Sequence, residues 1–220
     1  LSPDGRQLAF AAAEATGATA LWLHSFESGV SVRLTGSEGA RLPFWSPDGR
    51  HIGFFTRDKL KKTDPGGSPQ VLCDIGASNP RGGSWSKEGV ILFSSGSTRP
   101  LQRVPAEGGA AVDATRLADS PTAISNRWPQ FLPDGRHYIY VAIASRPSDS
   151  GVLLGSLDGG KPIRVSSIET GYEVLYSSTG HLLFVRNGGL SAQAFDPSTA
   201  RLSGEPVRLA PSLGLGGDRY

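Results

Sequence analysis

The sequence predicts an all-β protein made of repeated four-stranded units. Three observations support this: a recurring turn motif, strand-like alternation after each copy, and no helical periodicity. The motif is W-S-P-D-G-R at 45–50; a shortened copy opens the chain and looser copies begin at 85, 131 and 176. Successive turn glycines lie 44, 40, 46 and 45 residues apart, by subtraction of their numbers: Gly5, Gly49, Gly89, Gly135 and Gly180. This interval suits a four-stranded repeat, and also helical repeats of similar length.

The residues that flank the turns favour strands over helices. Each turn is followed by two apolar or aromatic residues separated by one position: Leu8/Phe10, Ile52/Phe54, Ile91/Phe93, Tyr138/Tyr140 and Leu182/Phe184. A two-residue spacing places both side chains on one face of a strand. A large residue precedes each turn: Leu1, Trp45, Trp85, Phe131 and Tyr176. Glycine and proline interrupt nearly every stretch of ten residues, which argues against helical repeats.

The remaining strands complete a sheet in each unit. A third strand follows, as in ALWLHSF and VLLGSLD, then a second glycine-containing turn and a fourth strand, as in VSVRLT and PIRVS. In the first turn, proline presets φ, aspartate caps the bend and glycine supplies a positive φ. One such sheet cannot bury both of its faces, so the sheets must pack face to face around an axis. The predicted fold is therefore a β-propeller.

The repeat also sets the expected blade limits. The predicted blades span about 1–39, 40–85, 86–130, 131–175 and 176–210, and 211–220 forms a tail leading to a missing blade. The first blade is incomplete because it lacks nearly all of its first strand. Closed propellers typically have 4–8 blades, so we expect four complete blades and one partial blade from a larger ring. The chain begins at Leu1 and contains no methionine, which also suggests an internal fragment.

Composition narrows the class of protein. The 220 residues are 38% hydrophobic and 19% charged, which is typical of a globular protein. A net charge of +2 gives no reason to expect nucleic acid or an anionic membrane as partner. No apolar run approaches the roughly 20 residues needed to cross a bilayer. The single cysteine, Cys73, cannot form an internal disulfide and is expected to be a small buried apolar residue.

Several longer strings resemble a known group of proteins. They are WSPDGRHIGFF, LKKTDPGGSPQVLCD, GVILFSS, RWPQFLPDGRHYIY and LLFVRNGGLSAQAFDPSTARLSGEPVRLA. Together they resemble the TolB-like, WD-repeat-like propeller segments at the C-terminal end of bacterial membrane-anchored serine/threonine kinases. The short element W-S-P-D-G is shared more widely, with TolB itself and with prolyl-oligopeptidase-type peptidases. The resemblance implies an extracytoplasmic propeller, joined to the membrane only through a missing upstream helix that follows a kinase domain.

Catalytic motifs are absent from the sequence. It contains no H-R-D, no D-F-G and no G-x-S-x-G, and its glycine-bearing stretches fit no phosphate-binding loop. We therefore expect no enzymatic activity and no cofactor in this segment. His51, His137 and His181 share one repeat position, which could suggest a metal site. Equivalent positions in different blades lie well apart, so we expect polar strand-start residues and no metal.

Arginines in the first strands are the candidate site. Arg41, Arg81 and Arg127 each lie four residues before the aromatic that precedes the turn, and Tyr172 breaks the series. The first strand of a propeller blade is innermost, so these side chains would lie at the rim of the channel. There they could bind a carboxylate or phosphate through paired hydrogen bonds. Alternatively, each could brace a neighbouring loop through an acidic residue: Glu38, Asp74 or Asp119.

The loops at this rim form the expected partner surface. Connections from a fourth strand to the next first strand, at about 35–42, 74–82, 118–127 and 166–173, should share a face with second-to-third connections at 12–19, 94–99 and 145–151. Their lengths vary while the strand register does not, as is common for binding loops on a scaffold. We expect a non-catalytic binding or sensor domain that recognises a protein or a small anionic ligand. The alternatives are a gating propeller of a prolyl-oligopeptidase-like peptidase and a TolB-like periplasmic scaffold.

Overall fold

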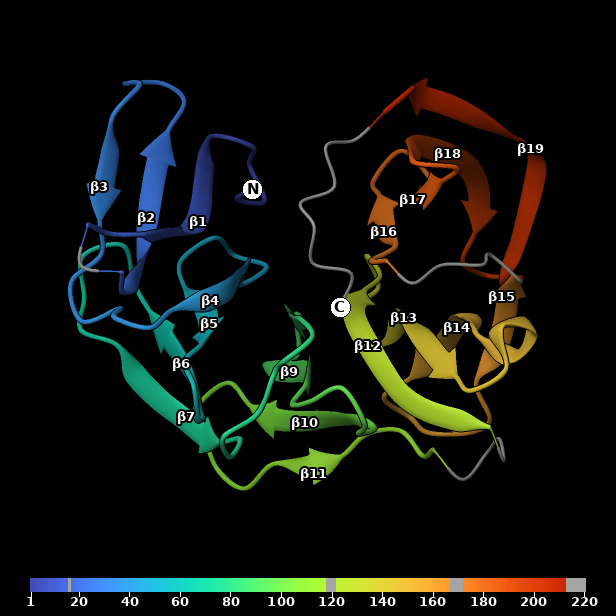
Figure 1. Ribbon diagram of the computed structural model, residues 1–220, viewed down its shortest axis with the longest axis horizontal. Coiled ribbons are helices and arrows are strands. Elements are labelled where there is room, and N and C mark those ends of the chain that lie inside the picture. Colours follow the sequence, from blue (N-terminus) through green and yellow to red (C-terminus); the bar gives the residue numbers. More distant parts are fainter. Residues whose placement is uncertain (16, 118–121, 167–171, 213–220) are drawn as a thin grey trace. The chain divides into compact units, whose positions relative to one another are not determined.

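The chain folds as a five-bladed β-propeller of mainly four-stranded antiparallel sheets, which confirms the predicted all-β fold class (Figure 1). The computed structural model describes residues 1–15, 17–117, 122–166 and 172–212. Across those ranges the one helix is a single 3₁₀ turn, η1 (Pro147–Asp149). No helix within them has the length and hydropathy needed to cross a membrane.

Each blade is a meander in which consecutive strands are neighbours in the sheet. The first blade has three strands: β1 (Gln7–Ala13), β2 (Thr19–Ser25) and β3 (Ser31–Arg33). The second is β4 (Arg41–Trp45), β5 (Ile52–Phe55), β6 (Lys59–Thr63) and β7 (Gln70–Asp74), and the third is β8 (Gly83–Trp85), β9 (Val90–Ser94), β10 (Leu101–Pro105) and β11 (Val112–Asp113). The fourth is β12 (Ala123–Phe131), β13 (His137–Ala144), β14 (Gly151–Ser156) and β15 (Ile163–Ser166), and the fifth is β16 (Leu175–Ser177), β17 (His181–Arg186), β18 (Gly189–Asp196) and β19 (Arg201–Ala210).

The blades divide between two compact units. The first unit, residues 1–97 and 101–114, contains the first three blades; the second, residues 98–100 and those from 115 onward, contains the other two. Each four-stranded sheet begins with the strand that precedes the repeated turn. Strand β8 pairs with β9 in the third sheet. The predicted limit between the second and third blades, at 85/86, falls between these two strands. In the expected tail 211–220, positions 213–220 lie outside the described residues.

The repeated turn is closed by one serine and one aspartate. The Ser46 hydroxyl donates to the Asp48 carboxylate (2.6 Å) and accepts the backbone N–H of His51 (2.9 Å). Asp48 also accepts the backbone N–H of Arg50 (3.1 Å), and Gly49 has a φ of 69°, which favours glycine. The first blade repeats this network at Ser2 and Asp4 with the same distances to within 0.1 Å. The recurring motif is therefore a recurring hydrogen-bond network, as its turn chemistry predicts.

Removing the serine of this turn should cost stability. In the variant Ser46→Ala, the buried hydroxyl no longer bridges Asp48 and the His51 amide. We expect the free energy of unfolding to fall by about 1–2 kcal/mol, the usual cost of deleting a partner from a buried hydrogen bond. Urea denaturation followed by fluorescence measures this. The exposed Ser68 of the same blade is the control, and an equal loss in Ser68→Ala would contradict the role assigned to the turn.

Alternate residues of β5 pack against different neighbouring blades. In β5 the Phe54 side chain packs with Leu21 and Leu23 of the first blade, whereas Phe55 packs toward Phe93 of the third blade, with ring centroids 6.3 Å apart. Both β5 phenylalanines are fully buried. The predicted pairs Ile52/Phe54 and Ile91/Phe93 therefore each cover the preceding blade. In the second unit, Leu182/Phe184 packs in the same way against the fourth blade.

Phe44 fills the space where the first strands of two blades meet. Strand β4 contacts β8, and the Phe44 ring lies over Gly53 of its own blade and Gly83 of the next. A Cβ atom added at Gly83 would lie 2.6 Å from the ring, and one added at Gly53 would overlap it more closely. Neither glycine has a positive φ. The sequence therefore uses glycine here to make room for an aromatic ring, not to form a turn.

Filling this space should destabilise the first unit. In Gly53→Ala the new methyl group collides with Phe44, which is packed in the core between the second and third blades. We expect a loss of about 1–3 kcal/mol in the free energy of unfolding, as for other overpacked cores. Gly66→Ala is the matched control, because its added methyl group would meet open space. If the two variants unfold at the same urea concentration, the packing argument is wrong.

Candidate functional site

The three predicted arginines share a local backbone feature. Each precedes a residue with a positive φ: Leu42 (49°), Gly82 (87°) and Trp128 (49°). In β4 and β12 the pairing skips one position, from Arg41↔Phe55 to Phe44↔Gly53 and from Arg127↔Val141 to Gln130↔Ile139. These are β-bulges, and a proline follows the left-handed residue in both, as bulges permit. At Arg41 and Arg127 the common sequence spacing thus reflects a β-bulge in the first strand of the blade.

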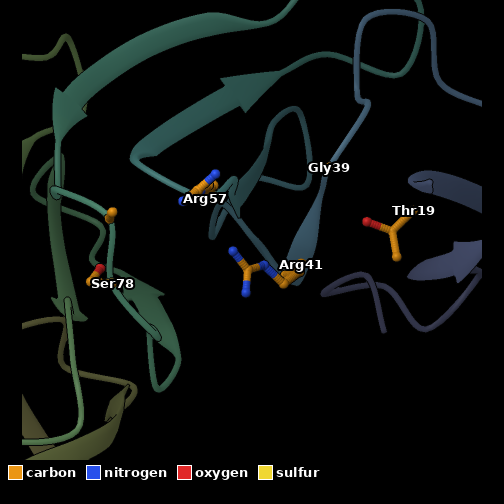
Figure 2. A pocket seen from close by; sticks show the side chains of 6 residues that line it. Thr19, Gly39, Arg41, Arg57 and Ser78 are labelled. Atoms are coloured by element: carbon orange, nitrogen blue, oxygen red, sulfur yellow. The ribbon is translucent and has the colours of Figure 1, made fainter. Parts of the chain in front are cut away.

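Arg41 lines a cavity of about 540 Å³ in the first unit. The lining residues come from three loops and from the first residues of β2 and β4: Thr19, Gly39, Arg41, Arg57, Ala77 and Ser78. Figure 2 shows the guanidinium groups of Arg41 and Arg57 in the space between Ser78 on one side and Thr19 on the other. The cavity is therefore bordered by two cationic groups and by hydroxyl groups.

Among the described residues, no acid neutralises these two arginines. The described lining contains no aspartate or glutamate, and neither guanidinium forms an ion pair with a described residue. The nearest acidic residues in sequence are bound elsewhere: Glu38 accepts from Arg33 (2.7 Å), and Asp58 pairs with Lys59 (3.5 Å). The alternative in which Glu38 braces Arg41 therefore does not describe this loop.

A polar atom beside the same cavity has no partner among the described residues. The Ser78 hydroxyl oxygen is shielded from solvent and, among the described residues, has no hydrogen-bond partner. A buried hydroxyl of this kind is costly unless a ligand or water completes it. Two guanidinium groups and a hydroxyl together supply several donors but no charged acceptor. The arrangement suits a carboxylate or phosphate oxygen.

The other two predicted arginines have different surroundings. Arg81 is half-buried in the first unit, where its backbone N–H donates to the carbonyl of Ser94 (3.0 Å), and it does not line this cavity. Arg127 belongs to the second unit and is buried; its Nε donates to Ser125 (2.8 Å) and its guanidinium lies 5.8 Å from the ring centre of Trp128. Asp74, which could have braced Arg81, pairs with Lys59, and Asp119 lies outside the described residues.

Sequence reasoning missed Arg57. This residue lies in the connection from β5 to β6, the second-to-third connection of the second blade. Second-to-third connections are predicted to share a face with the connections 35–42 and 74–82. Applying that prediction to the second blade would have identified Arg57. Hydrogen bonds confirm two of the expected loop pairings: Gly39 donates to Thr19 (2.7 Å), and Ser145 donates to Thr122 (2.8 Å).

The three equivalent histidines have separate local partners. His51 lies 3.2 Å from Asp64, His137 lies 2.6 Å from Asp134, and the ring of His181 lies 3.0 Å from the carbonyl oxygen of Thr179. Within the described part of the chain, no three His, Cys, Asp or Glu residues gather as metal ligands. Cys73 is buried, as predicted, and burial raises the pKa of its thiol to about 11. A thiol with such a pKa is unreactive at neutral pH.

Comparison with solved structures supports the fold. The chain is similar to TolB from Acinetobacter baumannii, with a TM-score of 0.69 and 14% identity over 90% of this chain and 51% of that one, so it spans about half of that TolB. A putative TolB from Agrobacterium tumefaciens is similar with a TM-score of 0.61 and 17% identity, over 94% of this chain and 78% of that one. A structure from work on two prolyl endopeptidases is similar with a TM-score of 0.58 and 14% identity, over 95% of this chain and 34% of that one. No family model and no curated protein sequence matches the chain. At these identities the similarity establishes a β-propeller fold related to TolB and prolyl endopeptidase propellers, and nothing of activity.

Proposed function

We propose that this chain is a non-catalytic recognition domain that binds a carboxylate or phosphate group, presented by a protein or a small ligand, at the loop face of its first unit. The observation that carries the proposal is the cavity that contains Arg41 and Arg57 without an acidic residue. Two like charges held in one cavity repel each other, and an anion between them turns that repulsion into attraction. Guanidinium groups also match the planar geometry of these oxyanions.

The loops support recognition by their placement. The cavity takes residues from the connections 12–19, 35–42 and 74–82, and from the β5–β6 turn. Four of the six lining residues lie in connections between strands, Thr19 and Arg41 are the first residues of β2 and β4, and the strands beneath them form a packed core. A binding site built from loops on a rigid scaffold is a common arrangement for partner recognition.

Removing one arginine should weaken anion binding. The probes are citrate and inorganic phosphate, titrated into the full chain by isothermal calorimetry at low salt. A hydrogen bond to a charged group contributes about 1.5–3 kcal/mol, so Arg57→Ala should raise Kd about ten- to hundred-fold. Arg50→Ala removes the same charge from an exposed turn outside the cavity and should leave Kd within about threefold. Equal effects of the two substitutions would show only a general charge effect and would refute the site.

We further propose that the chain is the extracytoplasmic part of a receptor-like bacterial serine/threonine kinase. The support is the sequence resemblance of the strings WSPDGRHIGFF and LLFVRNGGLSAQAFDPSTARLSGEPVRLA to kinase-attached propellers. The parent gene tests this directly. An upstream membrane-length apolar segment, preceded by H-R-D and D-F-G motifs, is expected. A parent without them contradicts the kinase assignment while leaving the anion site untouched.

A gating propeller of a prolyl-oligopeptidase-like peptidase is the second candidate. The fold similarity to a prolyl endopeptidase structure favours it, since this chain aligns with about a third of that protein. It requires a G-x-S-x-G motif downstream of residue 220, followed by aspartate and histidine. A TolB-like periplasmic scaffold, favoured by the two TolB structures, requires instead an upstream signal peptide and no enzyme domain.

A further inference from the structure

We propose a second ligand site, in the fourth blade, that binds a small organic acid with an apolar body. The site is a cavity of about 320 Å³ in the second unit. This volume lies at the lower end of ligand pockets and equals that of about ten water molecules in bulk liquid. It is separate from the Arg41 cavity, so it adds to the proposed function and does not depend on it.

One face of the fourth sheet forms the floor of this cavity. The pairings Tyr140↔Leu153↔Arg164 and Asn126↔Ala142 place these five side chains on the same side of the sheet. The opposite face, with Ile139, Val141 and Leu154 among its side chains, packs against the fifth blade. Leu117 and Pro162 add further apolar lining. Tyr140, Ala142 and Leu153 therefore give the floor an apolar area for a compact hydrocarbon group, beside the polar side chains of Asn126 and Arg164.

Cations outnumber acids around this floor. Among the described residues, Arg116, Lys161 and Arg164 line the cavity together with one acid, Asp149. The Asp149 carboxylate is already hydrogen-bonded by the Thr122 hydroxyl (2.7 Å). Among the described residues, Arg116 and Lys161 form no ion pair. An anionic ligand would therefore meet three positive charges and one occupied carboxylate.

Arg164 is held in place by neutral groups and forms no ion pair with a described residue. Its guanidinium donates to the backbone carbonyl oxygens of Asp149 (2.8 Å) and Ser150 (3.2 Å). These neutral acceptors fix the orientation of the group and leave its charge available. Asn126 is 3% exposed, donates to the Thr115 hydroxyl (2.8 Å), and still borders the cavity. A pre-oriented cation and a fixed amide beside an apolar floor suit an acid group attached to a compact apolar body.

The proposal is tested with four small probes that separate charge from apolar body. Cyclohexanecarboxylate and benzoate carry both, acetate carries only the charge, and cyclohexanol carries only the apolar body. Their binding to the full chain is followed by amide chemical shifts in NMR titrations. We expect the two larger acids to bind at least tenfold more tightly than acetate or cyclohexanol, with shifts at Ala142, Leu153 and Arg164.

Two variants and one control locate the site. Ala142→Leu fills the cavity floor and should weaken cyclohexanecarboxylate at least tenfold, while Lys161→Gln, which leaves the floor intact, should weaken it about threefold or more. Arg57→Ala alters only the cavity in the first unit and should leave this Kd unchanged. The proposal would be overturned if either cavity variant bound cyclohexanecarboxylate with unchanged affinity. It would also be overturned if cyclohexanol or acetate bound as tightly as the two larger acids. Because citrate and phosphate binding depends on the other unit, the two proposals fail independently.

Discussion

Replacing Phe54 with alanine is expected to lower the free energy of unfolding by about 3–5 kcal/mol, the usual cost of deleting a buried phenylalanine. The Phe54 ring has no exposed surface and packs between the first and second blades, beside Leu21, Leu34 and Ile52. Deleting it would leave a cavity lined by both sheets, and packed cores relax only partly around such a gap. The face-to-face packing of blades predicts this size of effect, because no single sheet of the chain has a core of its own.

Equilibrium unfolding in urea, followed by tryptophan fluorescence, measures the effect. Three of the four tryptophans, Trp22, Trp45 and Trp85, lie in the first unit and report on it. Phe26→Ala is the matched control, because Phe26 is 54% exposed and should cost about 1 kcal/mol or less. If Phe54→Ala were no more destabilising than Phe26→Ala, the first and second blades could not share the core described.

The double substitution Arg41→Ala/Arg57→Ala should change binding and stability in opposite senses. With both guanidinium groups removed, citrate and phosphate binding should fall by at least a hundredfold, since each charge-assisted interaction contributes about 1.5–3 kcal/mol. Without ligand, however, the variant should be as stable as the natural chain or slightly more stable. Two like charges that share a cavity without an acid add no favourable ion pair to the fold.

Paired measurements of melting temperature and calorimetric affinity on the same preparation test this. A structural role, in which Arg41 braces the 35–42 loop, predicts the opposite: the double variant would melt at a lower temperature. A lower melting temperature with unchanged anion affinity would therefore refute the binding role.

Much of the fold could be predicted from local chemistry. The turn at 45–50 is specified by Ser46, Asp48 and Gly49, whose interactions involve neighbours within five residues. Apolar residues two positions apart lie on the same face of a second strand, as Ile52 and Phe54 do in the core between the first and second blades. Such features need no knowledge of the rest of the chain. That is why they were predicted correctly, along with the sheet topology that they imply.

The site depended on contacts that a sequence does not display. Arg41 was identified from its spacing, but the cavity also needs Arg57 and Ser78, which come from different connections. That Glu38 does not neutralise Arg41 could not be predicted either. Glu38 is three residues from Arg41 in sequence, yet it binds Arg33 of the first blade. Ion-pair choice among exposed residues is decided by small geometric differences, since such pairs contribute little energy.

The central claim, that Arg41 and Arg57 together hold an oxyanion, is tested most directly by a crystal structure of the full chain grown with selenate. Selenium gives an anomalous signal that locates a tetrahedral oxyanion without ambiguity. The account predicts a peak within hydrogen-bonding distance of both guanidinium groups and of the Ser78 hydroxyl. That peak should be absent in crystals of the double alanine variant. Ordered Arg41 and Arg57 side chains with no selenate between them would contradict the account.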